Sequence, residues 1–237
     1  REMAILFQDP RGALNPVLTV GAHLLETMRA HRRISRREAQ AEAKRLLYEV
    51  GIPDPGYHLR MYPSELSTGL CQRVGLALAI CLHPRLLVAD EPTSALDPSI
   101  QQQVMELIRE MKRKYAQSML LISHDLGLVA GLADRIAVSY HGRIVECAET
   151  DVITGSPAHP YTRALLDCRP GMERRHDHSP LPVIPGTPPG PETEMPGCSF
   201  TPRCPFSDSR CAGSLPLMTH LSGTHHAACF KPIGGAS

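Results

Sequence analysis

The sequence lacks the features that mark several specialised classes of protein. No apolar run approaches the roughly 18 to 20 residues that a membrane-spanning helix needs, no signal-peptide pattern follows Arg1, and no internal repeat recurs at a fixed period. The net charge is only +1, which argues against binding nucleic acid through a basic face. Hydrophobic residues make up 42% and charged residues 21% of the 237 positions, as in a globular protein of one large or two small domains.

Two helices are predicted from their capping residues. Ser35 and Glu38 form a capping box, and the apolar periodicity that follows continues until Gly51 ends the segment. Asp97 with Pro98 directly after it begins a second amphipathic helix.

Short apolar runs between and after these helices predict strands. Residues 85–90 and 118–123 are typical of buried strands in a parallel sheet that helices cover on both faces. Residues 135–140 and 143–147 are separated by a His-Gly turn and predict a hairpin. The alternation of strand and helix predicts an α/β fold.

The composition changes near residue 171. A last helix is expected over residues 160–168, after which Pro, Gly, Ser, His and Cys dominate. The stretch 179–196 carries too many prolines for a helix and is interpreted as an extended linker or loop.

Two adjacent carboxylates, Asp90 and Glu91, end the first of these buried strands, and Pro92 follows them. Open α/β sheets bind their ligands at the carboxyl ends of their strands. One such carboxylate can hold Mg²⁺ and its neighbour can polarise an attacking water. Taken alone, the pair could equally end a strand at a solvated turn.

Four further motifs surround this pair in a fixed order: Phe7-Gln8-Asp9-Pro10, Leu66-Ser67-Thr68-Gly69-Leu70, Ser94-Ala95-Leu96-Asp97 and Ser123-His124-Asp125. Together with Asp90-Glu91 they resemble the ATP-binding subunits of ABC transporters, in the order Q-loop, signature motif, Walker B, D-loop and switch histidine. The resemblance implies a P-loop ATPase core with a parallel sheet flanked by helices, an ABC helical subdomain and a Cys/Pro-rich C-terminal extension. It also implies ATP and Mg²⁺ as ligands.

The same resemblance assigns roles to individual residues. It implies that Glu91 is the general base or orients the water, and that His124 contacts the γ-phosphate. It implies that Gln8 senses the nucleotide and that Asp90 holds Mg²⁺. The residues expected to bind the ATP of a partner subunit lie in the signature helix and the D-loop: Ser67, Thr68, Gly69, Gln72 and Asp97.

The likeness narrows to the oligopeptide, dipeptide and nickel importer ATPases through four stretches: residues 7–16, 62–67, 90–97 and 159–166. It implies an ATP-hydrolysing subunit of an importer, most simply for peptides, at the cytoplasmic face of the plasma membrane. The implied partners are a second ATPase subunit, two transmembrane permease subunits and an extracytoplasmic solute-binding protein. No nucleic acid is expected.

Two other hypotheses compete with this one. The chain could be a non-hydrolysing partner or remnant that supplies a signature motif in trans and a metal-binding tail. A soluble ABC ATPase that acts on ribosomes or DNA fits poorly, because such a protein would lack the importer-type tail and the helix after His159.

The sequence departs from the family pattern at two points. No Gly-x-x-x-x-Gly-Lys-Ser/Thr loop occurs, and only seven residues precede Gln8. The chain is therefore expected to be N-terminally incomplete and inactive alone, while still able to donate its signature motif. Thr68 stands where the family usually has Gly, which favours a heterodimer with one weaker site.

Half of the eight cysteines lie in the tail, at positions 198, 204, 211 and 229. Zinc sites usually contain two cysteines only two to four residues apart, and Cys198, Cys204, Cys211 and Cys229 contain no such pair. In the importer subfamily a pattern of this kind is associated with a [4Fe-4S] cluster, which is the expected cofactor, with zinc as the alternative. The nearby histidines are interpreted as solvated surface residues, and the other four cysteines as packing residues.

The expected domain organisation follows these motifs. Residues 1–8 end the N-terminal core with the Q-loop, and residues 9–82 form the helical subdomain with the signature helix. Residues 83–147 carry Walker B, the D-loop and the switch histidine, and residues 148–237 form the C-terminal extension.

Overall fold

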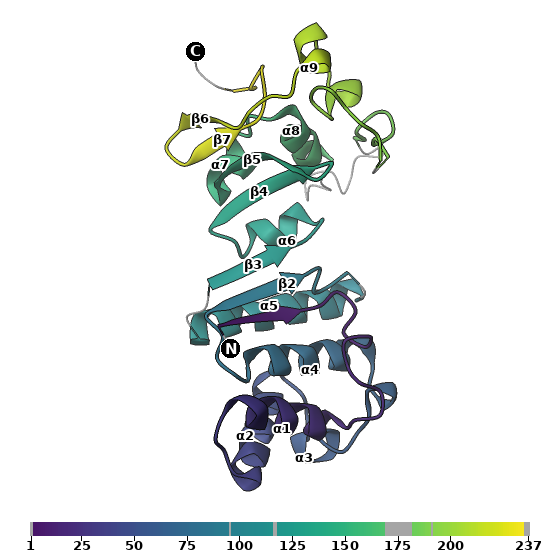
Figure 1. Cartoon of the computed structure of the whole chain (residues 1–237), viewed down its shortest axis with the longest axis vertical. Helices are drawn as coiled ribbons and strands as arrows, with labels where there is room; N and C mark the ends of the chain where they lie inside the picture. The colour runs from purple at the N-terminus through teal and green to yellow at the C-terminus, as the bar shows by residue number, and fades with distance from the viewer. Residues whose placement is uncertain (1, 95, 116–117, 169–181, 191, 235–237) are drawn as a thin grey trace, which may run out of the picture. The chain divides into compact units, whose positions relative to one another are not determined.

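The structure, a computed structural model, describes residues 2–94, 96–115, 118–168, 182–190 and 192–234. The chain divides into two compact units, residues 1–124 and 125–237 (Figure 1). The boundary expected at residues 147 and 148 lies inside the second unit. None of the described helices has the length and apolar character needed to cross a bilayer.

The first unit contains a three-stranded parallel sheet in the order β1-β2-β3 with helices around it. Its elements are β1 (Met3–Leu6), α1 (Val20–His31), α2 (Arg36–Glu49), α3 (Pro55–His58), the 3-10 turn η1 (Pro63–Glu65), α4 (Thr68–Ile80), β2 (Leu86–Asp90), α5 (Pro98–Tyr115) and β3 (Ser118–Ile122). The predicted helices at Arg36 and Pro98 and the two predicted strands are confirmed.

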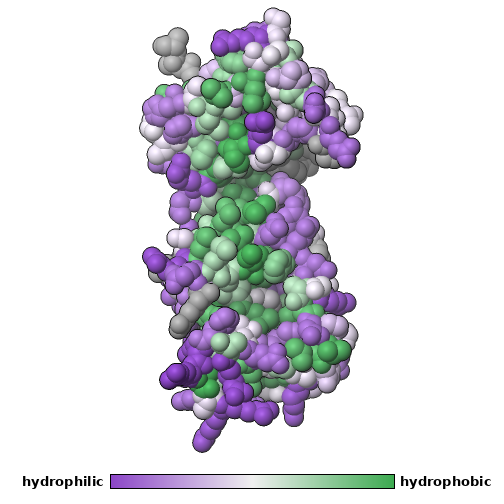
Figure 2. Space-filling model, viewed as in Figure 1, coloured by the Kyte–Doolittle hydropathy of each residue, from purple (hydrophilic) through white to green (hydrophobic). Residues whose placement is uncertain are grey.

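Only one face of this sheet is buried, which corrects the expectation of cover on both faces. The residues Leu6, Leu87 and Ala89 are almost inaccessible, and Gly75 of α4 approaches Leu6 so closely that an added Cβ would lie 3.2 Å from its Cδ1. Apolar residues on the opposite face are exposed: Met3 by 56%, Ile5 by 43%, Leu120 by 52% and Ile122 by 44%. Figure 2 shows this apolar surface over the strands. The strand alternation directs these side chains away from α4, and no described residue of this unit covers them.

The caps account for where the helices begin. Ser35 Oγ accepts from the N–H of Glu38 and the Glu38 carboxylate accepts from the N–H of Ser35, so the predicted capping box is present. The sequence reading missed α1, although Thr19 caps it by accepting from the N–H of Ala22.

The second unit contains a four-stranded sheet in the order β4-β5-β7-β6. Its elements are α6 (Leu126–Ala130), β4 (Arg135–Tyr140), β5 (Arg143–Glu149), α7 (Thr150–Gly155), α8 (Pro160–Asp167), the 3-10 turn η3 (Thr201–Arg203), α9 (Ser209–Gly213), β6 (Thr219–Ser222) and β7 (His225–Ala227). The predicted hairpin and the helix at Pro160 are confirmed.

The hairpin turn and an aromatic core organise this unit. Both turn residues have positive φ, 47° at His141 and 73° at Gly142, as a tight two-residue hairpin requires. Phe200 is 1% exposed, and its ring centroid lies 5.3 Å from those of Tyr140 and Tyr161. The predicted linker lies partly outside the described residues, and its described parts, 182–190 and 192–196, contain neither helix nor strand.

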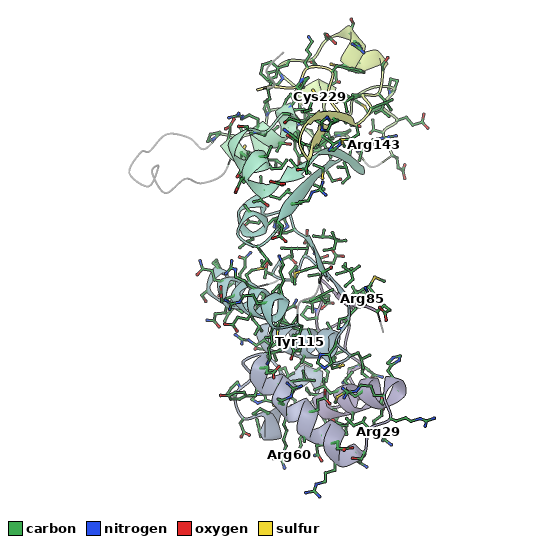
Figure 3. The ribbon with its side chains drawn as sticks, turned by 90° about the vertical axis from the view of Figure 1, so that its left-hand side faces the viewer. Arg29, Arg60, Arg85, Tyr115, Arg143 and Cys229 are labelled. Atoms are coloured by element: carbon green, nitrogen blue, oxygen red, sulfur yellow. The ribbon has the colours of Figure 1, made fainter. Side chains whose placement is uncertain are left out.

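An ionic cluster at Glu49 joins the end of α2 to the end of α5. The Glu49 carboxylate accepts from Arg45 Nη1 at 2.6 Å, from Lys114 Nζ at 2.7 Å and from the hydroxyl of Tyr115 at 2.6 Å. Tyr115 is labelled in Figure 3. Burial by itself raises the pKa of Glu49, but the hydrogen bonds from Lys114 and Tyr115 and the charge of Arg45 hold that pKa below its ordinary value.

Replacing this carboxylate should destabilise the chain in a pH-dependent way. We expect Glu49→Gln to lower the free energy of unfolding at pH 7 by about 1 kcal/mol, because ion pairs and charged hydrogen bonds are lost. A depressed folded-state pKa contributes stability above the ordinary pKa of 4.5 and loses it as pH falls through the folded value. The deficit of the variant should therefore shrink below pH 4.5 in denaturant titrations.

Glu106→Gln is the matched control, since Glu106 pairs with Arg109 on the exposed surface of α5 and its side chain is 53% exposed. This variant should change the free energy of unfolding by less than about 0.5 kcal/mol. Equal effects of the two variants, or a Glu49→Gln deficit that does not change with pH, would contradict the role given to Glu49.

Candidate functional site

Three of the predicted site residues meet at the carboxyl ends of β1, β2 and β3. The Glu91 carboxylate accepts from Gln8 Nε2 at 2.9 Å through one oxygen and from His124 Nδ1 at 3.1 Å through the other. Gln8 follows β1, Glu91 follows β2 and His124 follows β3, so the parallel order of the strands brings them together. The side chain of Glu91 is 27% exposed and that of His124 is 71% exposed, so both are open to a ligand.

Glu91 has an unusual backbone conformation. Its φ is 41°, in the left-handed region that is costly for a residue with a Cβ. Its N–H donates to the carbonyl of Ile122 at 2.9 Å, and the N–H and hydroxyl of Ser94 donate to its own carbonyl. These bonds hold a strained residue in place, and such strain is concentrated at functional sites.

Asp90 is the last residue of β2 and lies next to Glu91 in the chain. Mg²⁺ in nucleotide sites is held by one or two carboxylates together with phosphate oxygens, not by a cage of protein ligands alone. A single carboxylate at a strand end is therefore a suitable donor for Mg²⁺ bound to a phosphorylated ligand.

The signature and D-loop residues line a cavity of about 530 Å³. Ser67 caps α4 by accepting from the N–H of Leu70 at 3.3 Å, and the first turn of α4 faces the cavity. An added Cβ on Gly69 would lie 3.1 Å from Ile100 Cγ2, so Gly69 permits α4 and α5 to approach closely here. The helix start presents N–H groups and a partial positive charge to an anion.

Two charged side chains complete this cavity. Asp97 accepts from the hydroxyl of Ser99 at 2.6 Å and from the N–H of Ile100 at 3.1 Å, and these bonds lower its pKa. Arg73 was missed by the sequence reading, although it lies four residues after Gly69 and therefore on the same helix face. Its guanidinium donates to the carbonyl of Val50 at 2.9 Å and also lines the cavity.

Gln72 is the one predicted signature-helix residue that does not reach this cavity. It is 2% exposed, and its Nε2 has no hydrogen-bond partner among the described residues. One residue before Arg73, it lies on the face of α4 that packs into the first unit.

A hydrogen bond connects the Q-loop to the signature motif. Asp9 accepts from the N–H groups of Arg11 and Gly12 and shapes the turn after Gln8. Arg11 Nη2 then donates to the carbonyl of Leu66 at 2.6 Å, one residue before the cap of α4. This hydrogen bond links the turn after Gln8 to the start of α4.

The four tail cysteines line one small cavity of about 20 Å³ in the second unit. Cys198, Cys204, Cys211 and Cys229 all contribute to it, with Cys229 labelled in Figure 3. The other lining residues are His159, Pro160, Phe200, Thr201, Ser207, Pro216 and Phe230. Within the described part of the chain, no three His, Cys, Asp or Glu side chains are arranged to hold a single metal ion.

The backbone around the cysteines is closely packed. The N–H of Cys198 donates to the carbonyl of Cys211 at 2.9 Å, and an added Cβ on the preceding Gly197 would lie 2.2 Å from that carbonyl oxygen. Asp208 caps α9 by accepting from the N–H of Cys211 and pairs with Lys231 Nζ at 2.9 Å. The loops that carry three of the cysteines are thereby tied to one another.

Without a bound cation the thiols of Cys204 and Cys229 remain neutral. Burial raises the pKa of Cys204, and burial together with the neighbouring cysteines raises the pKa of Cys229 to about 11. A bound cation would reverse this, because metal ligation stabilises thiolates.

A buried carboxylate lies behind this cavity and was not predicted. Glu146 has no exposed side-chain surface and accepts from the N–H of Ala158 at 2.6 Å, the N–H of His159 at 3.0 Å and His225 Nε2 at 2.7 Å. The interpretation of His225 as a solvated surface residue is wrong, because it is 7% exposed. Burial lowers the pKa of His159 to about 4, so its ring is neutral at pH 7.

Comparison with known proteins gives these arrangements a context. Residues 1–94 match the ABC transporter family and residues 145–211 match the C-terminal region of oligopeptide/dipeptide transporters. The dipeptide transport ATP-binding protein DppD of Escherichia coli is 42% identical over 235 residues, which cover 99% of this chain and 71% of that protein. The protein of the same name from Bacillus subtilis is 43% identical over 97% of this chain and 68% of its own length.

This chain belongs to the ABC transporter ATP-binding proteins of the oligopeptide/dipeptide type. The structure of cbiO1 from Clostridium perfringens, part of the ABC transporter complex cbiONQ, superposes with a TM-score of 0.57 at 24% identity. That match covers 65% of this chain and 60% of cbiO1, and it supports the α/β fold of an ABC ATPase.

The predicted family and enzyme class, an ABC-type ATPase, are therefore confirmed, and ATP with Mg²⁺ is the ligand of that family.

The close packing at Gly197 gives a direct test of the cysteine cavity. We expect Gly197→Ala to lower the free energy of unfolding by about 1–3 kcal/mol, because the new methyl group collides with the carbonyl of Cys211. Gly213→Ala in the same helix as Cys211 is the control, since nothing lies within 4 Å of its added Cβ. In thermal unfolding Gly197→Ala should have a clearly lower melting temperature than Gly213→Ala. Equal melting temperatures would contradict the packing described.

Proposed function

We propose that this ABC ATPase couples ATP hydrolysis to the import of peptides. The observation that carries the proposal is the meeting of Gln8, Glu91 and His124 at the strand ends. The peptide substrate class is taken from the relatives, which are named dipeptide transport ATP-binding proteins. The alternative of a non-hydrolysing remnant gains no support from those relatives.

Glu91 orients and deprotonates the attacking water in this proposal, and Asp90 holds Mg²⁺. Both oxygens of Glu91 are occupied by hydrogen bonds from Gln8 and His124 in the structure. A γ-phosphate is a stronger acceptor for these donors, so nucleotide binding draws them away and frees the carboxylate to act as a base. The arrangement is thus a resting state that the substrate itself activates.

The signature cavity serves a nucleotide held by a second ATPase subunit. The N–H groups of the α4 start, the Ser67 hydroxyl and Arg73 offer donors to the γ-phosphate, and the ionised Asp97 contacts the partner. Thr68 adds a branched side chain at this helix start, which favours pairing with a non-identical subunit. Gln72 supports the helix from inside.

The proposed assembly is peripheral to the membrane. This ATPase subunit and its non-identical partner bind beneath two transmembrane permease subunits at the cytoplasmic face, and an extracytoplasmic solute-binding protein delivers the peptide. The absence of a spanning helix among the described residues is compatible with that position.

Glu91→Gln tests the catalytic proposal in the assembled transporter. We expect this variant to retain ATP binding and to lower the rate of phosphate release by about 10²–10⁴-fold, because the base is lost while the side-chain shape is kept. Glu106→Gln, on the exposed surface of α5, should leave the rate unchanged. Unchanged phosphate release in the Glu91 variant would remove Glu91 from its role.

We further propose that the four cysteines hold a [4Fe-4S] cluster. A single zinc ion at about 2.3 Å from each thiolate brings its ligands to within roughly 4 Å of one another, and no such arrangement exists among the described residues. A cluster binds one cysteine at each iron and accepts sulfurs that lie further apart. All four cysteines line the cavity, and Phe200 and Phe230 line it beside them.

The residues around the thiols also suit a cluster. The N–H of Lys231 donates to Cys229 Sγ at 3.3 Å, and a buried ring nitrogen of His159 lacks a partner. Donors of this kind stabilise the charge on cluster sulfurs. When bound, the group would add a redox-active crosslink to the tail.

Metal analysis of the chain purified without oxygen tests this second proposal. We expect about four iron and four sulfide per chain with a broad visible absorption, and loss of both in Cys204→Ser. Cys168→Ser, which alters a cysteine outside the cavity, should keep the full iron content. Stoichiometric zinc without iron would overturn the cluster.

A further inference from the structure

One polar atom at the four-cysteine cavity has no partner. His159 is 1% exposed and lines the cavity, and its Nε2 forms no hydrogen bond with any described residue. A buried N–H or nitrogen lone pair without a partner is unfavourable, so native structures rarely leave one unmatched. The atom therefore indicates a missing partner in the cavity.

The hydrogen bond at the other ring nitrogen determines what this partner must be. His159 Nδ1 accepts from the N–H of Tyr161 at 3.0 Å, which caps α8. Because Nδ1 uses its lone pair in this way, the proton of the neutral ring lies on Nε2. His159 can therefore donate from Nε2, but it cannot ligate a metal through Nε2 without losing the one N–H proton of the neutral ring.

The position of the ring is fixed by the main chain on both sides. The N–H of His159 donates to the Glu146 carboxylate at 3.0 Å, and the following Pro160 begins α8. Its ring also lies against Phe200, with centroids 6.0 Å apart. The donor is thus held rigidly, and four cysteine sulfurs line the same cavity as possible acceptors.

We propose that His159 Nε2–H donates a hydrogen bond to a sulfur of the cluster held by Cys198, Cys204, Cys211 and Cys229. The inference rests on the cluster proposed above. A hydrogen bond to a cluster sulfur stabilises the more negative, reduced state and raises the reduction potential. His159 is a positioning residue that couples the potential of the cluster to the Glu146 network.

Two substitutions separate the donor from the helix cap. The Asn side chain places its oxygen near the position of Nδ1, so His159→Asn keeps the cap of α8 and removes the donor at Nε2. The Gln side chain places its amide nitrogen near the position of Nε2, so His159→Gln keeps the donor and removes the cap. His220→Gln is the control, because His220 is exposed on β6 and does not line the cavity.

Redox titration of the purified chain, followed by electron paramagnetic resonance, reads out the hydrogen bond without any transport assay. We expect the midpoint potential to move to more negative values in His159→Asn, and to stay near that of the unsubstituted chain in His159→Gln and His220→Gln. In thermal unfolding His159→Gln should have the lower melting temperature of the two His159 variants, because it loses the cap of α8.

A second measurement tests the hydrogen bond in the chain with His159 unchanged, so it does not depend on whether a His159 variant binds the cluster. In the reduced, unsubstituted chain labelled with ¹⁵N-histidine, pulsed electron paramagnetic resonance should detect a weak ¹⁵N coupling across the hydrogen bond, and His220→Gln should retain it. A cluster that shows no such coupling, or an unchanged potential in His159→Asn, overturns the hydrogen bond and leaves the cluster intact. Absence of iron from the unsubstituted chain overturns the cluster itself and this inference with it.

Discussion

The second unit depends on the burial of one carboxylate. Glu146 has no exposed surface, and leaving such a charge unpaired in the interior costs several kcal/mol. Three donors from two segments prevent this: the N–H groups of Ala158 and His159, and the ring of His225. The strand β5, the start of α8 and the strand β7 are thereby held at one point, and none can leave without exposing or isolating the charge.

The position of the cysteine cavity follows from that constraint. Glu146 pairs with Ala227 in the sheet, and Cys229 follows only two residues later. The bond to the His159 N–H fixes the residue whose ring lines the cavity. The carboxylate thus sets two walls of the cavity from behind, while the Asp208 pair with Lys231 and the cap of α9 set the others.

The sequence predicted correctly those features that depend on residues close together in the chain. Ser35, Ser67 and Asp97 each cap a helix within three or four residues, so their positions could be predicted from neighbouring letters alone. Gln8, Glu91 and His124 were grouped by family resemblance, and the parallel register of three strands explains why they meet.

Features that depend on distant partners could not be predicted. Glu146 and His225 are 79 positions apart, and no periodicity links them. His225 was therefore interpreted from the sequence as a solvated residue of the tail. The exposure of Leu120 and Ile122 was missed for a related reason, since an apolar strand does not indicate which of its faces another element will cover. Gln72 was assigned from the motif, but the rotation of α4 turns it inward.

Glu91 and Glu146 are both glutamates, but the different donors and solvent exposure around them suit them to different roles. Both carboxylates have hydrogen bonds at both oxygens, but two of the three donors to Glu146 are backbone N–H groups that cannot rotate away, and no solvent reaches it. The donors to Glu91 are the ends of two side chains, Gln8 and His124, and Glu91 is partly exposed. A ligand can therefore displace the donors of Glu91 at little energetic cost, whereas displacing those of Glu146 would require unfolding. The first arrangement suits a group that must change partners in each catalytic cycle, and the second suits one that must never do so.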